Sequence, residues 1–409
     1  MAQICVYFQL HQPRRLADFS IFDLGDEAAK YVSSSENDTN EVVFHKVASK
    51  SYFPMLSLLK KLLKKYPSFV FSLSISGLFL EQAQQWEPGI VTLLQDIIAT
   101  GQVEVFSETY YHSLASIYSP TEFKAQVMEH QRAMLDYFGV IPTTFRNTEL
   151  IYSNAVAEQV AALGFEGTLT EAVPRYLGNR QKTRLYHSYT PSHLPILLKH
   201  AELSDDIAFR FSDKSWSGYP LTVEKYLHWL DRYGDEELIN LFMDFETFGE
   251  HQWEDTGIFE FFSNLVAVAQ DKHAFVLPRS IFAQFASEPA TKLEVYDVPV
   301  PISWADVDRD LTAWIDNPFQ QDSLRILYSL EKQILAIGDE KLIKQWRYLQ
   351  TSDHFYYMCT KWANDGDVHA YFSPFDSPYE AYRRYSIVLS DIKAKVHQLL
   401  DHPSLKLIH

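Results

Sequence analysis

The segment LINLFMDFETFGEH, residues 238–251, carries the pattern that decides the fold. Its first six residues, Leu238–Met243, are apolar apart from Asn240 over the length of one strand, and acidic and aromatic residues follow at once. A short, mainly apolar run is typical of a strand buried on both faces, as in a parallel sheet. The acidic residues then lie at the carboxyl end of that strand.

Similar apolar runs occur earlier in the chain, with amphipathic stretches between them. The expected strands are Ile4–Leu10, Phe69–Ile75, Val103–Phe106, Thr143–Arg146, Phe165–Leu169, Ile207–Phe211 and Leu238–Met243. The expected helices between them include Pro54–Lys65, Pro120–Phe138, Ser153–Leu163 and Val223–Arg232. Alternation of strand and helix predicts an α/β fold with a parallel sheet and crossover helices. A closed barrel suits this number of strands better than an open sheet.

The last quarter of the chain has a different pattern. The segments Gln320–Ile337, Glu340–Thr351 and Pro378–Leu400 show apolar residues at spacings of three and four, which is typical of helices. We therefore expect a domain boundary near residue 290. The barrel would occupy residues 1–290, and a helical domain would occupy residues 291–409.

Charge and hydropathy limit the classes of partner. The formal net charge is −17 and the sequence pI is about 5.3, which disfavours nucleic acid and anionic membrane surfaces as partners. No apolar run reaches the roughly 18 residues of a membrane span, and the N-terminus lacks a secretory pattern. These features predict a cytoplasmic protein. Cys5 and Cys359 have no metal-binding spacing, and their role and the oligomeric state are left open.

Aromatic residues make up 15% of the chain, and this proportion has two interpretations. Aromatic side chains dominate ordinary protein cores. The same rings also stack on the apolar faces of sugars, while phenol and indole groups bond sugar hydroxyls. Composition alone favours the core interpretation.

The carboxyl ends of parallel barrel strands converge on one cleft, so the residues just after each strand are candidates for function. Many of these residues are polar or ionisable. They are His11, Glu81, Glu108, His112, Arg146, Glu149, Glu171, Asp244, Glu246 and His251.

Two of these acids suggest a specific chemistry. Cleavage of a glycosidic bond uses a proton donor and a second carboxylate, which lie about 5–5.5 Å apart in retaining enzymes. Glu149 and Asp244 follow strands four and seven, which can face each other across a barrel mouth. Glu246 lies two residues after Asp244, on the same side of an extended segment, where each carboxylate raises the proton affinity of the other. Taken singly, any of these acids is as well explained by a helix cap or an arginine partner.

Other chemistries have weaker support. His11, His112 and His251 suggest a metal site, but the first motif has one histidine followed by Gln and Pro, so we predict neither a metal nor a cofactor. The chain has no G-x-S-x-G elbow and no glycine-rich phosphate loop. A metal-dependent deacetylase or mannosidase and a non-catalytic carbohydrate-binding protein stay as alternatives.

Five ordered motifs resemble those of glycoside hydrolase family 57, in particular its compact α-amylase-like members. They are His11-Gln12-Pro13, GQVEV at Gly101–Val105, FRNTELIY at Phe145–Tyr152, MDFETFGEH at Met243–His251 and TSDHFYYM at Thr351–Met358. The resemblance implies an incomplete (β/α)7 barrel followed by a helical bundle that completes the substrate cleft. It also implies a retaining mechanism without a metal, with Glu149 as the nucleophile and Asp244 as the general acid/base.

The resemblance predicts a hydrolase of α-1,4-glucosidic bonds in starch- or glycogen-type glucans. The alternatives within this chemistry are a 4-α-glucanotransferase or another α-glycosidase, such as an α-galactosidase. Further residues are expected to bind substrate or to tune the two acids because of their positions. They are His11, Glu81, Glu108, His112, Arg146, Glu246, His251, Trp304, Asp310, Trp314, Asp353 and His354.

Overall fold

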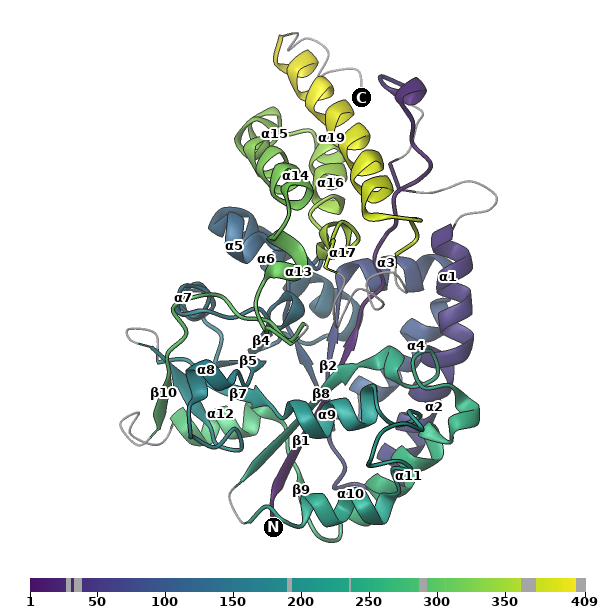
Figure 1. Cartoon of the computed structure of the whole chain (residues 1–409), viewed down its shortest axis with the longest axis vertical. Coiled ribbons are helices and arrows are strands. Elements are labelled where there is room, and N and C mark those ends of the chain that lie inside the picture. Colours follow the sequence, from purple (N-terminus) through teal and green to yellow (C-terminus); the bar gives the residue numbers. More distant parts are fainter. Residues whose placement is uncertain are drawn as a thin grey trace. The chain divides into compact units, whose positions relative to one another are not determined.

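The computed structural model describes residues 1–26, 31–32, 39–189, 193–234, 237–286, 293–305, 307–361 and 373–401 (Figure 1). It divides into two compact units, each assembled from several chain segments. The first contains Met1–Gln12, Val43–Tyr110 and Lys124–Trp304, and the second contains Pro13–Val42, Tyr111–Phe123 and Ala305–His409. Strands β1 to β10, whose bounds follow, all belong to the first unit.

In the part of the chain that the structure describes, the first unit contains two sheets of five strands. One has the order β3-β2-β1-β8 with β9 paired to β1, and the other has the order β10-β6-β7-β5-β4. Every pairing is parallel except that of β6 with β7. The strands are β1 Gln3–Leu10, β2 Phe71–Ile75, β3 Val103–Phe106, β4 Thr144–Arg146, β5 Gly167–Glu171, β6 Tyr186–Ser188, β7 Pro195–Lys199, β8 Leu238–Asp244, β9 Ala274–Phe275 and β10 Glu294–Tyr296.

Hydrogen bonds join the two sheets at two places. After β3, Ser107 accepts from the backbone N–H of Arg146 at 2.8 Å, and its own N–H donates to Thr144 at 2.9 Å. At β8, the backbone carbonyl of Asn240 accepts from His200 at 2.8 Å. The Asn240 side chain also donates to the carbonyl of Leu198, at the end of β7, at 2.8 Å. The strands that carry the predicted acids therefore belong to one connected hydrogen-bonded set.

Side chains of β1 alternate between two apolar clusters, as the two-residue period of a strand requires. Ile4, Val6 and Phe8 belong to a cluster that also includes residues of the surrounding helices. Cys5 and Tyr7 point to the other face, in a cluster with residues of β3, β5 and β8. Full burial of a side chain such as Phe8 stabilises the fold by about 1.5–3 kcal/mol. Both faces of the strand are therefore packed.

Helices of the first unit pack against these sheets, and α1 and α6 begin in segments of the second unit (Figure 1). In α4, for example, Ile90, Leu94 and Ile97 are buried at helical spacing. The helices are α1 Thr39–Val47, α2 Phe53–Lys65, α3 Gly77–Trp86, α4 Pro88–Ile98, α6 Pro120–Phe138, α7 Asn154–Ala162, α8 Pro174–Leu177, α9 Ala201–Ala208, α10 Val223–Leu230, α11 Ile258–Ala269 and α12 Pro278–Ala286.

The second unit is built from helices. They are α5 Ala115–Tyr118, α13 Thr312–Ile315, α14 Pro318–Ser329, α15 Glu331–Ile337, α16 Glu340–Tyr348, α17 Ser352–Tyr356 and α19 Pro378–Asp401. Asn317 begins α14 with a capping box to Gln320. The guanidinium of Arg347, in α16, donates to the buried carboxylate of Glu122 at 2.7 Å. In the parts of the chain that the structure describes, no helix is both long and apolar enough to cross a bilayer.

Two sequence expectations are wrong. Ile207–Phe211 is not a strand, because α9 covers Ala201–Ala208 and buries Leu203 and Ile207 four residues apart. The strand in this part of the chain is β7, and the antiparallel β6 precedes it. The single helix expected over Gln320–Ile337 is two helices, α14 and α15, separated at Leu330.

We predict that Gly249→Ala lowers the free energy of unfolding by about 3 kcal/mol or more. Gly249 has φ +105°, and an added Cβ would lie 1.9 Å from the carbonyl oxygen of Lys50. Gly257 also has a left-handed φ, +81°, but no heavy atom lies within 4 Å of the position of its Cβ. Gly257→Ala should therefore cost only the backbone strain, about 1–2 kcal/mol. Urea unfolding of both variants tests this, and equal losses would contradict it.

Candidate active site

Glu149 lies in a strained turn just after β4. Asn147 begins the single 3₁₀ turn Thr148–Leu150: its side-chain oxygen accepts from Thr148 at 3.1 Å, and its amide donates to Ile151 at 2.9 Å. Glu149 has φ 55° and Leu150 has φ 51°. Such values in residues other than glycine cost about 1–3 kcal/mol each and occur often at functional sites. The turn fixes the direction in which Glu149 leaves the strand.

Trp304 holds Glu149 through both its backbone and its side chain. Its indole Nε1–H donates to Oε2 of Glu149 at 2.8 Å, and its backbone N–H donates to the Glu149 carbonyl at 3.2 Å. Two residues away, Ile302 and Tyr152 exchange backbone hydrogen bonds of 2.9 and 3.0 Å. The structure therefore places Trp304, a residue predicted from the sequence, directly on the predicted nucleophile.

Asp244 is the last residue of β8 and lies beside Gln9 of β1 in the parallel register. Gln9 belongs to a buried network of hydrogen bonds. It accepts from the Tyr7 hydroxyl at 2.6 Å, and its amide donates to the carboxylate of Glu108 at 3.1 Å. Ser74 donates to the same oxygen of Glu108 at 2.7 Å. Glu108 is therefore a buried acceptor held by two neighbouring strands.

Arg146 and Asp244 both lie close enough to Tyr7 for their charges to affect the pKa of its hydroxyl. Burial raises the pKa of Tyr7 well above its usual value; the charge of Arg146 opposes this rise, and Glu108 and Asp244 add to it. Arg146 also lies with Cζ 5.1 Å from the centroid of the Trp304 ring. Arg146 thus connects the surroundings of Glu149 with those of Asp244.

Glu246 is buried two residues beyond Asp244. Burial, followed by the nearby charge of Asp244, raises the pKa of Glu246 to about 8. The hydroxyl of Tyr52 donates to its Oε1 at 2.5 Å. At neutral pH Glu246 is therefore mainly protonated, so it adds little negative charge beside Asp244.

Three other predicted residues of the first unit have identified surroundings. The Nδ1 atom of His11 lies 2.8 Å from the hydroxyl of Ser76, the residue that caps α3. Glu81, in α3, accepts from the hydroxyl of Tyr110 at 3.2 Å. Burial lowers the pKa of His251 to about 4, so its imidazole is neutral at pH 7.

Five predicted residues belong to the second unit, and their role in binding sugar stays a prediction. His112 is buried, and its carbonyl accepts from Ser352 at 2.9 Å. Asp310 accepts from the backbone of Thr312 at 2.8 Å, and Trp314 is buried with its ring 6.0 Å from that of Tyr356. Asp353 and His354 lie in α17, and burial lowers the pKa of His354 to about 4.

Three residues near the predicted acids were not among the residues predicted from the sequence. Tyr7 and Gln9 lie two apart in β1, and a polar pair on one face of an otherwise apolar strand is a signal that could have identified them. Lys199 ends β7, with its Nζ 5.3 Å from the centroid of the Trp304 ring. It was missed because β7 itself was not expected.

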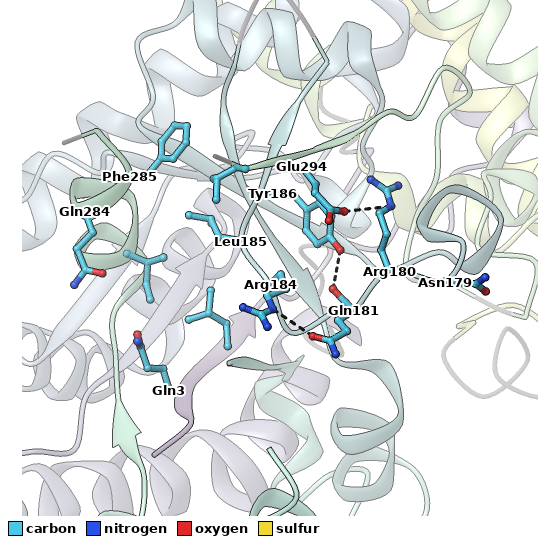
Figure 2. Close-up of a pocket in the computed structure, with 13 residues that line it drawn as sticks. Gln3, Asn179, Arg180, Gln181, Arg184, Leu185, Tyr186, Gln284, Phe285 and Glu294 are labelled. Atoms are coloured by element: carbon cyan, nitrogen blue, oxygen red, sulfur yellow. Dashed lines mark hydrogen bonds and ion pairs between the residues drawn. The ribbon is translucent and has the colours of Figure 1, made fainter. Parts of the chain in front are cut away.

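A separate surface pocket of about 860 Å³ lies near the amino ends of β1 and β8, whose first residues, Gln3 and Leu238, pair with each other (Figure 2). Its lining also includes Arg180, Arg184 and Phe285. The predicted site residues do not line it. Barrel active sites lie at the opposite, carboxyl ends of the strands. Among the described residues, no three His, Cys, Asp or Glu side chains are grouped as metal ligands would be.

We predict that Glu246→Gln changes how stability depends on pH. The folded state keeps the Glu246 proton up to about pH 8, whereas an unfolded chain releases it near 4.5. The wild-type free energy of unfolding should therefore fall with pH across this window, by up to about 1.4 kcal/mol per unit from this group. Urea unfolding at pH 5 and pH 8 should show a smaller fall for Glu246→Gln. The exposed Glu254→Gln serves as the control, and an identical fall in both variants would contradict the prediction.

Comparisons with known proteins show which family the chain resembles. A model of glycosyl hydrolase family 57 matches residues 5–295. A relative from Methanocaldococcus jannaschii named "Putative alpha-amylase" is 39% identical over 404 residues, covering 96% of this chain and 84% of the relative.

Several solved structures share the fold, two of them enzymes from Thermococcus species. A branching enzyme from Thermococcus kodakaraensis has a TM-score of 0.72 at 13% identity, covering 99% of this chain and 92% of its own. A 4-alpha-glucanotransferase from Thermococcus litoralis has a TM-score of 0.62 at 15% identity, covering 95% and 57%. Because the family model spans most of the chain and the relative is this similar, the protein belongs to glycosyl hydrolase family 57.

Proposed function

We propose that the protein is a retaining glycoside hydrolase that cleaves α-1,4-glucosidic bonds in starch- or glycogen-type glucans. Glu149 is the nucleophile and Asp244 is the general acid/base. The observation that carries this proposal is the turn after β4, where Trp304 donates a hydrogen bond to the carboxylate of Glu149. Arg146 lies over the Trp304 ring, and both Arg146 and Asp244 act electrostatically on Tyr7. Both acids are partly exposed, as groups that meet a substrate must be.

The reaction has two steps. First, the carboxylic acid of Asp244 gives its proton to the glycosidic oxygen while the Glu149 carboxylate attacks the anomeric carbon. The bond to the leaving sugar breaks, and a glycosyl ester forms on Glu149. Second, the Asp244 carboxylate takes a proton from water as the water oxygen attacks the same carbon. The ester bond breaks, both acids return to their first states, and the anomeric configuration is retained.

We infer that the two sheets form an incomplete (β/α)7 barrel, with β1, β2, β3, β4, β5, β7 and β8 as its strands. The hydrogen bonds at Ser107 and at Asn240 support this arrangement, because they connect the sheets on both sides. In such a barrel Glu149 and Asp244 come from strand ends that open onto one cleft.

The surroundings of the two acids also favour a neutral substrate. Glu108 and Glu149 are carboxylates, whereas Arg146 is enclosed and Lys199 is already paired with Asp205 at 3.0 Å and with Glu171 at 3.8 Å. An anionic sugar would meet repulsion that a neutral glucan does not.

Transfer to a sugar hydroxyl instead of to water is the second candidate. Two of the solved structures with this fold are named as a branching enzyme and a 4-alpha-glucanotransferase, whereas the M. jannaschii relative is named "Putative alpha-amylase". Water and a sugar hydroxyl compete for the same glycosyl ester, so the chemistry at Glu149 and Asp244 is shared.

Product analysis separates these candidates. We expect the wild type to convert maltoheptaose only into shorter maltooligosaccharides, whose newly formed ends have the α configuration by NMR. Glu149→Ala should be slower by several powers of ten, because each factor of ten reflects about 1.4 kcal/mol of lost transition-state stabilisation. Products longer than maltoheptaose would indicate transfer, and release of galactose from an α-galactoside would indicate an α-galactosidase. Equal trace turnover by wild type and Glu149→Ala on every α-glycoside would indicate a non-catalytic binding protein.

Asp244→Asn and Glu246→Gln should differ in how much activity they lose. The amide introduced by Asp244→Asn can neither donate nor accept the catalytic proton, a role that typically contributes about 10²–10⁴-fold. The Glu246→Gln variant keeps an uncharged side chain where Glu246 is mainly protonated, so its loss should be about tenfold or less. Measurement of kcat/KM at pH 6.5 compares the two. If Glu246→Gln is as damaging as Asp244→Asn, the assignment of the general acid within this motif is wrong.

A further inference from the structure

Arg146 is a buried cation that the proposed reaction does not use. Its side chain is 0% exposed, and Nε, Nη1 and Nη2 have no hydrogen-bond partner among the described residues. A guanidinium cannot lose its charge in a protein, and a buried charge without hydrogen bonds is strongly unfavourable. Its neighbours must therefore compensate for it.

Part of the compensation for the charge of Arg146 comes from the ring of Trp304. Its Cζ lies 5.1 Å from the centroid of the Trp304 ring, within the range of a cation–π interaction. Glu149 and Asp244 are partly exposed, whereas the nitrogens of Arg146 are enclosed. An enclosed guanidinium does not touch a sugar, so Arg146 must act through the groups around it.

We propose that Arg146 is a positioning residue that acts through Trp304 to keep the carboxylate of Glu149 ionised and in one orientation. This inference rests on the proposed role of Glu149 as the nucleophile. A cation on the face of the indole draws electron density from the ring and makes its N–H a stronger donor. The Nε1–H of Trp304 donates to Oε2 of Glu149 at 2.8 Å, and hydrogen bonds to the charged form of a carboxylate favour that form.

The other charges around Trp304 and Glu149 do not replace the charge of Arg146. Lys199 also lies over the Trp304 ring, at 5.3 Å, but its charge is balanced by Asp205 and Glu171. Glu108, just after β3, and Asp244, at the end of β8, both act on Tyr7 with negative charge, so they disfavour further negative charge there. Arg146 is therefore a cation in position to offset the charge of Glu149 through Trp304.

The test is the acid limb of the pH profile of kcat/KM on maltoheptaose, which reports ionisation of essential groups in the free enzyme. Arg146→Met removes the charge and keeps an unbranched chain, and its acid limb should move up by about one pH unit or more. Arg146→Lys keeps a cation and should recover at least half of that shift. Trp304→Phe keeps an aromatic face for Arg146 but lacks the N–H, and its acid limb should also move up.

Arg180→Met is the matched control, because Arg180 is also an arginine over an aromatic ring of the first unit (Figure 2). Its Cζ lies 5.4 Å from the Tyr186 ring, and its guanidinium donates to the carbonyls of Tyr176, Leu177 and Val295. It lines the separate pocket near the amino ends of β1 and β8. This variant should lower the unfolding temperature without moving the acid limb.

A second measurement does not need turnover. The infrared difference between each protein and its Glu149→Gln derivative isolates the carboxyl band of Glu149, which can be followed from pH 3 to pH 8. Protonation should occur at higher pH in Arg146→Met and in Trp304→Phe than in wild type. If Arg146→Met does not fold, Trp304→Phe and Arg146→Lys give the same comparison.

The outcomes separate the two proposals. If wild type cleaves no α-glucan, the proposed function fails, and the infrared titration still decides the role of Arg146. If wild type is active but Arg146→Met and Trp304→Phe keep the wild-type acid limb and infrared midpoint, Arg146 has only a structural role and the inference is overturned. A shift in Arg180→Met equal to that in Arg146→Met would overturn it as well.

Discussion

The hydrogen bond from the indole of Trp304 to the carboxylate of Glu149 is the interaction on which the proposed site depends. It joins residues 155 positions apart, so it depends on the chain returning to the end of β4 after the strands of the first unit. The exchange of backbone hydrogen bonds between Tyr152 and Ile302 holds the two segments in alignment. The left-handed turn at Glu149 and Leu150 is then held by contacts on both sides. Local strain of this kind persists only where surrounding structure determines the conformation.

Local patterns predicted the parts of the fold whose stability is local. Val103–Phe106 and Pro120–Phe138 have the predicted bounds, because a short, mainly apolar run and a long helical period are each self-contained signals. The strand predicted at Ile207–Phe211 was wrong, because the alternation of apolar and polar residues over these five positions competes with a helical spacing that starts at Leu203. The short strands β6, β9 and β10 have two or three residues each, and pairing partners, not sequence pattern, stabilise them.

The site also contains residues that local sequence patterns could predict and contacts that they could not. Glu149, Asp244 and Arg146 could be identified because each stands at the end of a recognisable strand. The contact of Trp304 with Glu149 could not be derived from spacing, since it depends on the path of the chain after β10. Lys199 depends on recognising β7, and the network of Tyr7, Gln9 and Glu108 depends on the register between strands. Long-range register is a property of the assembled sheet and has no local signature.

The buried ionisable groups of the first unit follow one electrostatic rule. Burial raises the pKa of Glu104 to about 7 and that of Glu246 to about 8, and it lowers that of His251 to about 4. Each of these groups moves toward its neutral form, because a low-dielectric interior penalises charge. Arginine has no accessible neutral form. A buried arginine therefore keeps its charge at every pH at which the protein folds, and that charge must be matched by an acid that stays ionised. Through Trp304, Arg146 favours the ionised form of Glu149, whereas burial favours the neutral form of Glu246. The two acids can therefore hold different protonation states although they lie in one neighbourhood.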